Sequence, residues 1–215
     1  MIHTASSRFP IRLAGMSVLA FELAATVRHD GHGGVADGLE TDAAVAKWIE
    51  RNSRLVAEVL GRPFDPADLV VDEGVRVPLL GVRRAIRSLF ARAVSPAPPS
   101  KADANKLFEP ATALRLLNKA ADELGTRHLD WPEDGEPLTR WSGRSSEPLA
   151  LLLGAIGWSG IDFLTGPDRA RLRACPAARC VKYFLQDDPR QTWCSPSCGN
   201  RERVNRYYQR KHATL

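Results

Sequence analysis

The first 174 residues of this 215-residue chain contain no cysteine, so they hold neither a disulfide nor a thiolate metal site. No apolar run approaches the roughly 20 residues that a membrane-spanning helix needs. The N-terminus lacks the basic segment, apolar stretch and small-residue cleavage site of a secretory signal. These absences predict a cytoplasmic protein that has no membrane partner.

Signatures of catalysis are missing as well. The sequence has no Ser-His-Asp pattern, no phosphate-binding loop and no dinucleotide fingerprint. Its five histidines are scattered along the chain, and a histidine without a spaced partner is more often an ordinary surface or packing residue. We therefore predict that the protein is not an enzyme.

Excess positive charge is confined to the C-terminal end. Residues 171–215 carry ten Lys or Arg and three acids, a formal charge of +7, whereas residues 1–170 carry twenty Lys or Arg and twenty-two acids, a formal charge of −2. A basic end of this kind is typical of proteins that bind a polyanion such as nucleic acid. A solvated basic tail is the simpler interpretation, but it does not explain why the cysteines lie in the same segment.

Apolar residues recur with a helical period over most of the first 170 residues. This period predicts helices at 17–27, 41–60, 77–94, 100–125 and 146–166, the fourth of them bent or split at Pro110. In the third helix one face is apolar. Its four arginines are expected to lie mostly on the opposite side: Arg83, Arg84, Arg87 and Arg92.

Two segments of the same region break the helical pattern. The glycine-rich stretch 28–38 is predicted to be a loop, and 128–143, with Asp134 and Gly135 at its centre, a β-hairpin. The predicted fold class is therefore mainly α: a helical N-terminal domain with one β-hairpin (1–170), followed by a small cysteine-bearing module (171–215).

All four cysteines lie in that module as two close pairs, Cys175-x4-Cys180 and Cys194-x3-Cys198. Two pairs separated by a short insert allow a short chain to surround one tetrahedral ion, and four sulfurs leave no open coordination position. We therefore predict one structural Zn²⁺. Disulfides fit a cytoplasmic chain poorly, whereas an iron–sulfur cluster and redox-active thiols are less favoured alternatives.

The rest of the module is predicted to be treble-clef-like. A short helix over 167–175 leads to the first cysteine, and the insert 181–193 has the pattern of a strand, a turn and a returning strand. A helix then begins at Pro196, which places Cys198 in its first turn.

This last helix is predicted to bind double-stranded DNA, because arginine suits both phosphates and guanine edges and asparagine suits adenine. Val204 and Tyr207 are expected to pack on Phe184 or Trp193. A solvated amphipathic helix is the alternative. The residues that we expect to contact DNA are Arg201, Arg203, Asn205, Arg206, Tyr208, Arg210 and Lys211.

The stretch "WCSPSCGNR" (193–201) resembles the CGNR zinc finger of bacterial proteins described as stress-responsive transcriptional regulators. The N-terminal region resembles the helical ABATE domain that accompanies this finger, through 9–15, 77–94 and 117–118. Two departures are visible: three residues separate the last two cysteines where four are expected, and the first helix keeps only Thr26 of an expected Asn-Thr pair.

Two residues of the motif have roles that can be argued without the family. Gly199 is expected to let the backbone approach a zinc-bound sulfur, and Asn200 to support the site by a hydrogen bond to the backbone between the first two cysteines. Ordinary helix-start residues are the alternative.

Together these features predict a bacterial DNA-binding transcription regulator. The helical domain would sense a small-molecule effector or form a homodimer, and the zinc module would hold the basic helix against DNA. A protein-interaction module is the second hypothesis, and an enzyme acting on a small molecule is the third.

Overall fold

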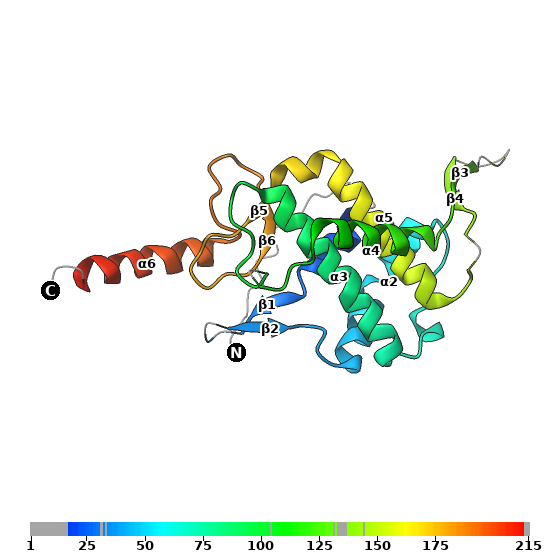
Figure 1. Cartoon of the computed structure of the whole chain (residues 1–215), viewed down its shortest axis with the longest axis horizontal. Coiled ribbons are helices and arrows are strands. Elements are labelled where there is room, and N and C mark those ends of the chain that lie inside the picture. The colour runs from blue at the N-terminus through cyan, green and yellow to red at the C-terminus, as the bar shows by residue number, and fades with distance from the viewer. Residues whose placement is uncertain are drawn as a thin grey trace, which may run out of the picture.

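The computed structural model describes residues 17–30, 32, 34–103, 105–130, 132, 137–143 and 145–212. Within them the chain is mostly helical and carries three small antiparallel sheets, which confirms the predicted fold class (Figure 1). The helices are α1 (Val18–Ala24), α2 (Asp42–Leu60), α3 (Glu73–Val94), α4 (Pro110–Asp122), α5 (Pro148–Thr165) and α6 (Pro196–His212). The strand pairs are β1 (Val27–His29) with β2 (Val35–Asp37), β3 (Arg127–Asp130) with β4 (Leu138–Trp141), and β5 (Leu172–Ala174) with β6 (Tyr183–Leu185).

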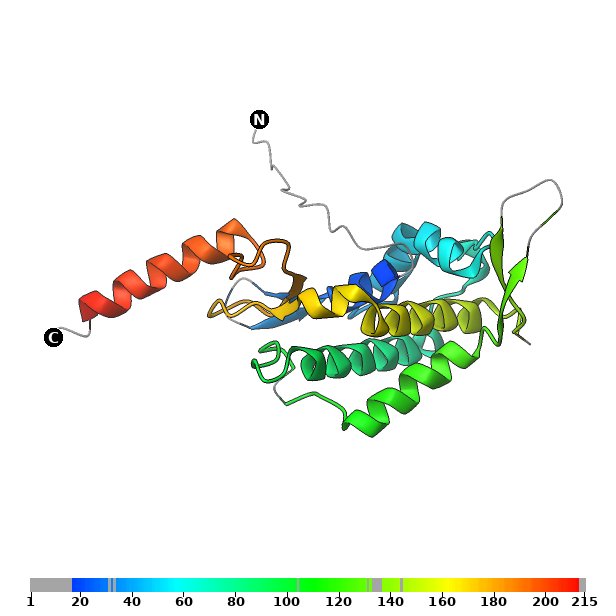
Figure 2. The ribbon, with the colours of Figure 1, turned by 90° about the horizontal axis from the view of Figure 1, so that it is seen from above.

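Helix α5 is the centre of the bundle, where α1, α2, α3 and α4 all contact it (Figure 2). Every residue of α5 except Thr165 is buried or half-buried. Its length of 18 residues and mean hydropathy of 1.4 would suit a membrane span, and it is the one such helix among the described residues. Because the other helices enclose it, α5 is the core helix of the bundle.

Glycines on α5 allow α4 to approach closely. A Cβ atom at Gly157 would lie 2.5 Å from the backbone nitrogen of Ala121, a distance at which one of the two helices would have to shift. A Cβ at Gly154 would meet the side chain of Leu124 at 2.6 Å. The sequence thus places its smallest residues where the two backbones nearly touch.

Aromatic rings fill the core between α1, α3 and α5. The ring centroids of Phe90 and Phe163 are 4.8 Å apart, and Phe21 lies 6.1 and 6.0 Å from them. Tyr183 of β6 packs edge-on against Phe90 at 5.6 Å. A residue that follows the first two cysteines therefore belongs to the core of the helical bundle.

Four elements differ from the predicted ones. The helix predicted at 17–27 ends at Ala24, and the segment predicted to be a loop forms the hairpin β1–β2, in which Val27 pairs with Asp37. Helix α3 begins at Glu73, four residues before the predicted start, because Asp72 caps it by accepting a hydrogen bond from the Val75 N–H at 3.2 Å. The helix predicted at 100–125 begins only at Pro110.

The other elements predicted for the helical region are confirmed. Helices α2 and α5 lie where the apolar period placed them, and the hairpin β3–β4 confirms the prediction for 128–143. The predicted turn residues Asp134 and Gly135 lie outside the described residues, as does the ABATE-like stretch 9–15.

Two of the four α3 arginines, which we expected to lie mostly opposite the apolar face, are buried in the structure. Arg83 and Arg87 are only 8% and 3% exposed. Residues from distant segments cover this side of α3: the hairpin β1–β2 provides Asp37, and the connection between α3 and α4 provides Asp103. Each carboxylate pairs with one guanidinium, which makes burial of the two arginines tolerable.

Candidate metal centre

The first two cysteines lie in the tight connection between β5 and β6. Strand β5 pairs with β6 in the register Leu172 to Leu185. The Cys175 N–H donates to the Lys182 carbonyl at 3.0 Å, and the Cys180 N–H to the Ala177 carbonyl at 2.9 Å. The segment 175–180, called the knuckle below, therefore places two thiols at the end of this hairpin.

This pairing corrects two predictions. The short helix over 167–175 is a 3₁₀ turn that ends at Arg171, after which β5 begins. The predicted strand pair within 181–193 is wrong, because β6 pairs with β5 and residues 191–193 are not a strand. The side chain of Gln186 bonds the carbonyls of Pro189 and Gln191, so the polar loop satisfies its own backbone without a second strand.

The second pair of cysteines arrives with α6. Ser195 immediately precedes the helix, and its hydroxyl accepts a hydrogen bond from the Cys198 N–H at 3.3 Å. Cys198 lies in the first turn of α6, as predicted. The fold thus brings all four thiols to one point from the knuckle, the loop and the helix.

The four sulfurs have the spacing of a single tetrahedral ion. All four Sγ atoms lie within 4.8 Å of one another, and the Cys194 sulfur lies 3.6 Å from those of both Cys180 and Cys198. Zinc–sulfur bonds of about 2.3 Å place tetrahedral sulfurs about 3.8 Å apart. A cluster of several iron atoms between these sulfurs would need them further apart. Among the described residues no other group of His, Cys, Asp or Glu has such a geometry.

The crowded thiols do not share their protons equally. Thiol hydrogen bonds from Cys180 and Cys194 lower the pKa of Cys175. The hydrogen bond that Cys194 makes to Cys175 in turn raises the pKa of Cys194. One negative charge in this small volume disfavours a second, so without a cation the cluster cannot hold four thiolates. A divalent ion removes that limit, and its binding displaces the remaining protons.

Comparison with protein families gives two matches that together span most of the chain. Residues 17–167 match the ABATE model, described as "putative stress-induced transcription regulator". The chain belongs to the ABATE family. Residues 171–211 match the CGNR zinc finger. A comparison with curated proteins found no match.

The finger match and the sulfur geometry together identify one zinc ion as the cofactor. All four positions around the ion are filled by protein sulfur, which is typical of a structural site. The description of the ABATE family is that of a regulator, not of an enzyme. The chain is therefore a member of a transcription-regulator family with a C-terminal zinc finger.

The structure supplies a further reason for glycine at position 199 of the CGNR motif, and its predicted role beside a zinc-bound sulfur stays a prediction. Gly199 is buried, and a Cβ atom there would lie 2.9 Å from the Trp193 ring. Asn200 is exposed, and its supporting role stays a prediction. Glu202 instead contacts the knuckle, where its carboxylate accepts a hydrogen bond from the Ala178 N–H at 3.3 Å. Sequence reasoning missed this role, because Glu202 stands among basic residues.

Beyond its first turns, α6 of the CGNR finger extends away from the rest of the molecule (Figures 1 and 2). The prediction that Val204 and Tyr207 pack on the module is wrong, because they are 55% and 51% exposed. The Arg206 guanidinium lies 5.9 Å from the centre of the Trp193 ring. Asn205 is half-buried, and the other residues predicted to contact DNA are exposed: Arg201, Arg203, Arg206, Tyr208, Arg210 and Lys211.

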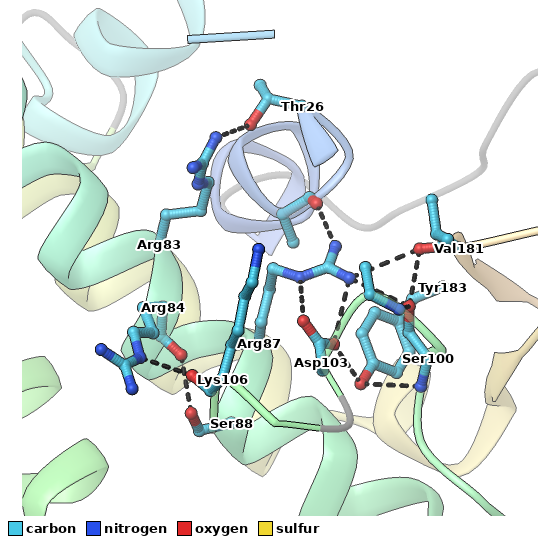
Figure 3. A network of polar contacts seen from close by, with 12 residues as sticks. Thr26, Arg83, Arg84, Arg87, Ser88, Ser100, Asp103, Lys106, Val181 and Tyr183 are labelled. Atoms are coloured by element: carbon cyan, nitrogen blue, oxygen red, sulfur yellow. Dashed lines mark hydrogen bonds and ion pairs between the residues drawn. The ribbon is translucent and has the colours of Figure 1, made fainter. Parts of the chain in front are cut away.

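A buried polar network joins the ABATE domain to the CGNR finger (Figure 3). Arg87 makes two hydrogen bonds to the Asp103 carboxylate, at 2.8 and 3.0 Å. Tyr183 of the finger donates to the same carboxylate at 2.9 Å, and burial raises the pKa of Tyr183, so it remains a donor. The Ser100 hydroxyl donates to the Val181 carbonyl at 2.8 Å.

Lys101 extends this connection to the knuckle itself. Its ammonium donates to the carbonyls of Ala177 and Pro176 at 2.6 and 3.1 Å. Leu172 and Leu185 belong to the main hydrophobic core, so the strands that carry the knuckle are packed on the helical bundle. A second, smaller core surrounds the sulfurs and includes Phe184.

Proposed function

We propose that the chain is a bacterial DNA-binding transcription regulator of the cytoplasm, in which the zinc finger (171–215) presents α6 to double-stranded DNA. The ABATE-like domain (1–170) would act as the sensor. Cys175, Cys180, Cys194 and Cys198 would be the zinc ligands. A reducing compartment keeps these thiols available for the metal.

The observation that carries this proposal is the placement of α6. The helix has 17 residues, which is about 25 Å at 1.5 Å per residue, and its first turn is fixed by Cys198. Such a helix fits the major groove of B-DNA, which is about 12 Å wide. Five basic residues and one acid lie between 201 and 211, so the projecting part is strongly cationic.

The residues proposed to contact DNA divide by their surroundings. Arg203, Arg210 and Lys211 are exposed side chains that suit phosphate oxygens. Arg206 lies close to the finger, beside Trp193, and Asn205 is half-buried. Arg201, Asn205 and Tyr208 share one stripe of the helix, which would face base edges or sugars.

Salt dependence tests this proposal. If about five phosphates are neutralised, the logarithm of the affinity for a mixed-sequence duplex should fall with the logarithm of salt concentration with a slope of about −4 to −5. Fluorescence anisotropy of the zinc-loaded chain measures this slope. Absence of duplex binding at low salt would contradict the proposal.

Matched variants assign the effect to α6. Replacing Arg203, Arg210 and Lys211 by glutamine should reduce the magnitude of the slope by about 3, because each phosphate contact contributes about 0.9. Replacing three exposed cations of the bundle changes the net charge equally and should leave the slope unchanged: Lys47, Arg62 and Lys119. An equal effect of both triple variants would show that only net charge matters.

One observation favours a protein partner as a second candidate function. Val204, Tyr207 and Tyr208 form an exposed apolar stripe on α6, with 51–57% of each residue accessible. Exposed apolar stripes of this kind commonly bind another protein. A complex recovered with the chain should then survive nuclease treatment, and loss of all partners after nuclease would exclude this candidate. Homodimer formation by the helical domain stays a prediction.

A further inference from the structure

A small cavity lies between the hairpin β1–β2, helix α3 and the connection between α3 and α4. Its volume is about 260 Å³, which suits a small organic molecule. Four cations and two carboxylates line it: Arg83, Arg84, Arg87, Lys106, Asp37 and Asp103. The lining therefore carries two more positive than negative charges.

The two carboxylates are already neutralised by arginines. Arg83 makes hydrogen bonds to both oxygens of Asp37, at 2.6 and 2.5 Å, and Arg87 pairs with Asp103 in the same two-point manner. Burial favours the protonated form of Asp37, but the hydrogen bonds from Arg83 and the Leu39 N–H, together with the charges of Arg83 and Lys106, outweigh it and keep the pKa of Asp37 below its usual value. These four residues thus form two closed ion pairs.

Arg84 and Lys106 provide the remaining charge. The Arg84 Nε donates to the Lys106 carbonyl at 2.5 Å, and its guanidinium lies 4.0 Å from the centre of the Phe108 ring. These contacts hold the group in place and leave its terminal nitrogens without a carboxylate partner among the described residues. The Lys106 side chain extends toward Arg83 and Arg87, and its ammonium forms no ion pair within the same part of the chain (Figure 3).

The rest of the wall is apolar. Val27, Val35, Leu80, Ala102 and Leu107 line the cavity beside the charged groups. A bare inorganic anion would leave this surface without a partner, whereas a carboxylate attached to a short apolar body would satisfy both parts.

We propose that this cavity is an effector site for small organic carboxylates, with Arg84 and Lys106 binding the carboxylate and the apolar wall binding the body. Hydrogen bonds connect the wall of this cavity to the finger. Ala102 and Asp103 line the cavity, and their neighbours Ser100 and Lys101 bond Val181 and the knuckle carbonyls. A ligand that shifts Ala102 and Asp103 would therefore change how firmly the knuckle is held; this regulatory part rests on the proposed function.

Calorimetric titration of the full-length zinc-loaded chain tests the site with benzoate, hexanoate and succinate as probes. Benzoate or hexanoate should bind saturably, benzamide should not bind, and inorganic phosphate should bind at least ten times more weakly than the better carboxylate. No binding by any of the three carboxylates would overturn the proposal, as would equal affinity for benzoate and benzamide.

Two variants locate the binding. Lys106→Gln should weaken carboxylate binding at least tenfold, and it removes no hydrogen bond of that side chain seen in the described structure. Arg84→Gln should have a similar effect, with circular dichroism checking that the fold is kept. The control Lys119→Gln removes an exposed cation of α4 and should leave the affinity unchanged. Unchanged binding by Lys106→Gln would place the ligand elsewhere and reject the site.

Duplex affinity measured with and without saturating carboxylate tests the regulatory part. We expect a change of about fivefold or more, the lower end of ordinary coupling between sites. A carboxylate that binds without changing duplex affinity would refute the coupling and leave the cavity assignment standing. A chain that binds no DNA at all would refute the proposed function, while the calorimetric result would still decide the cavity.

Discussion

Replacement of Cys194 by serine is expected to reduce bound zinc from one ion per chain to none and to abolish duplex binding. Cys194 is the most central of the four ligands, because its sulfur lies 3.6 Å from two of the others. Structural zinc contributes on the order of 10 kcal/mol to the folding of a small module, far more than the minor core around the sulfurs can replace. Elemental analysis and fluorescence anisotropy measure the two losses.

The same variant should leave the helical bundle folded. Leu172, Tyr183 and Leu185 are part of the main core, so β5 and β6 keep their packing without the metal. Helix α6 contributes no described residue to the main core, so its amides should exchange rapidly with solvent in hydrogen-exchange measurements. Thr192→Ala, an exposed change two residues away, is the matched control and should keep its zinc. Full zinc retention by Cys194→Ser, or unfolding of the entire chain, would contradict this expectation.

The sequence was sufficient to predict the metal centre, because its information is local. Two close cysteine pairs and a helix start at Pro196 require only short-range geometry, and the four sulfurs meet as expected. The apolar period located α2 and α5 for the same reason. The strand pair predicted within 181–193 is wrong because β6 pairs with β5, which precedes the knuckle in the sequence. Strand β6 could pair with either side, and β5 lies next to it once Cys175 and Cys180 form their turn.

Long-range polar partners could not be predicted in this way. Arg83 and Arg87 have the spacing of a solvated helix face, and nothing near them in sequence shows that Asp37 and Asp103 cover them. The partners lie 46 and 16 residues away. One sign was available, since two arginines four residues apart on a helix can each bind a separate carboxylate, but the sequence does not say which carboxylates. The contacts that connect the bundle to the finger were therefore the part that sequence reasoning missed.

Replacement of Arg87 by methionine is expected to lower the free energy of unfolding by about 3–5 kcal/mol, the usual effect of removing one partner of a buried ion pair. Asp103 would be left without its guanidinium partner at a site where its side chain is only 7% exposed. The carbonyl of Ala24, which accepts from Arg87 at 2.7 Å, would lose its donor as well. Denaturant unfolding of the zinc-loaded chain measures the change, with Arg92→Met as the matched control, because Arg92 is exposed on the same helix.

A double variant separates loss of the ion pair from loss of packing. If the cost comes mainly from the unpaired Asp103 charge, Arg87→Met combined with Asp103→Asn should be more stable than Arg87→Met alone, because no buried charge is left without a partner. Tyr183 would still have an oxygen acceptor at position 103, so the contact between bundle and finger would persist. A loss no greater than that of Arg92→Met would show that the pair contributes little. Additive effects of the two substitutions would show that Arg87 acts through its other contacts, to Ala24, Ser100 and Val181.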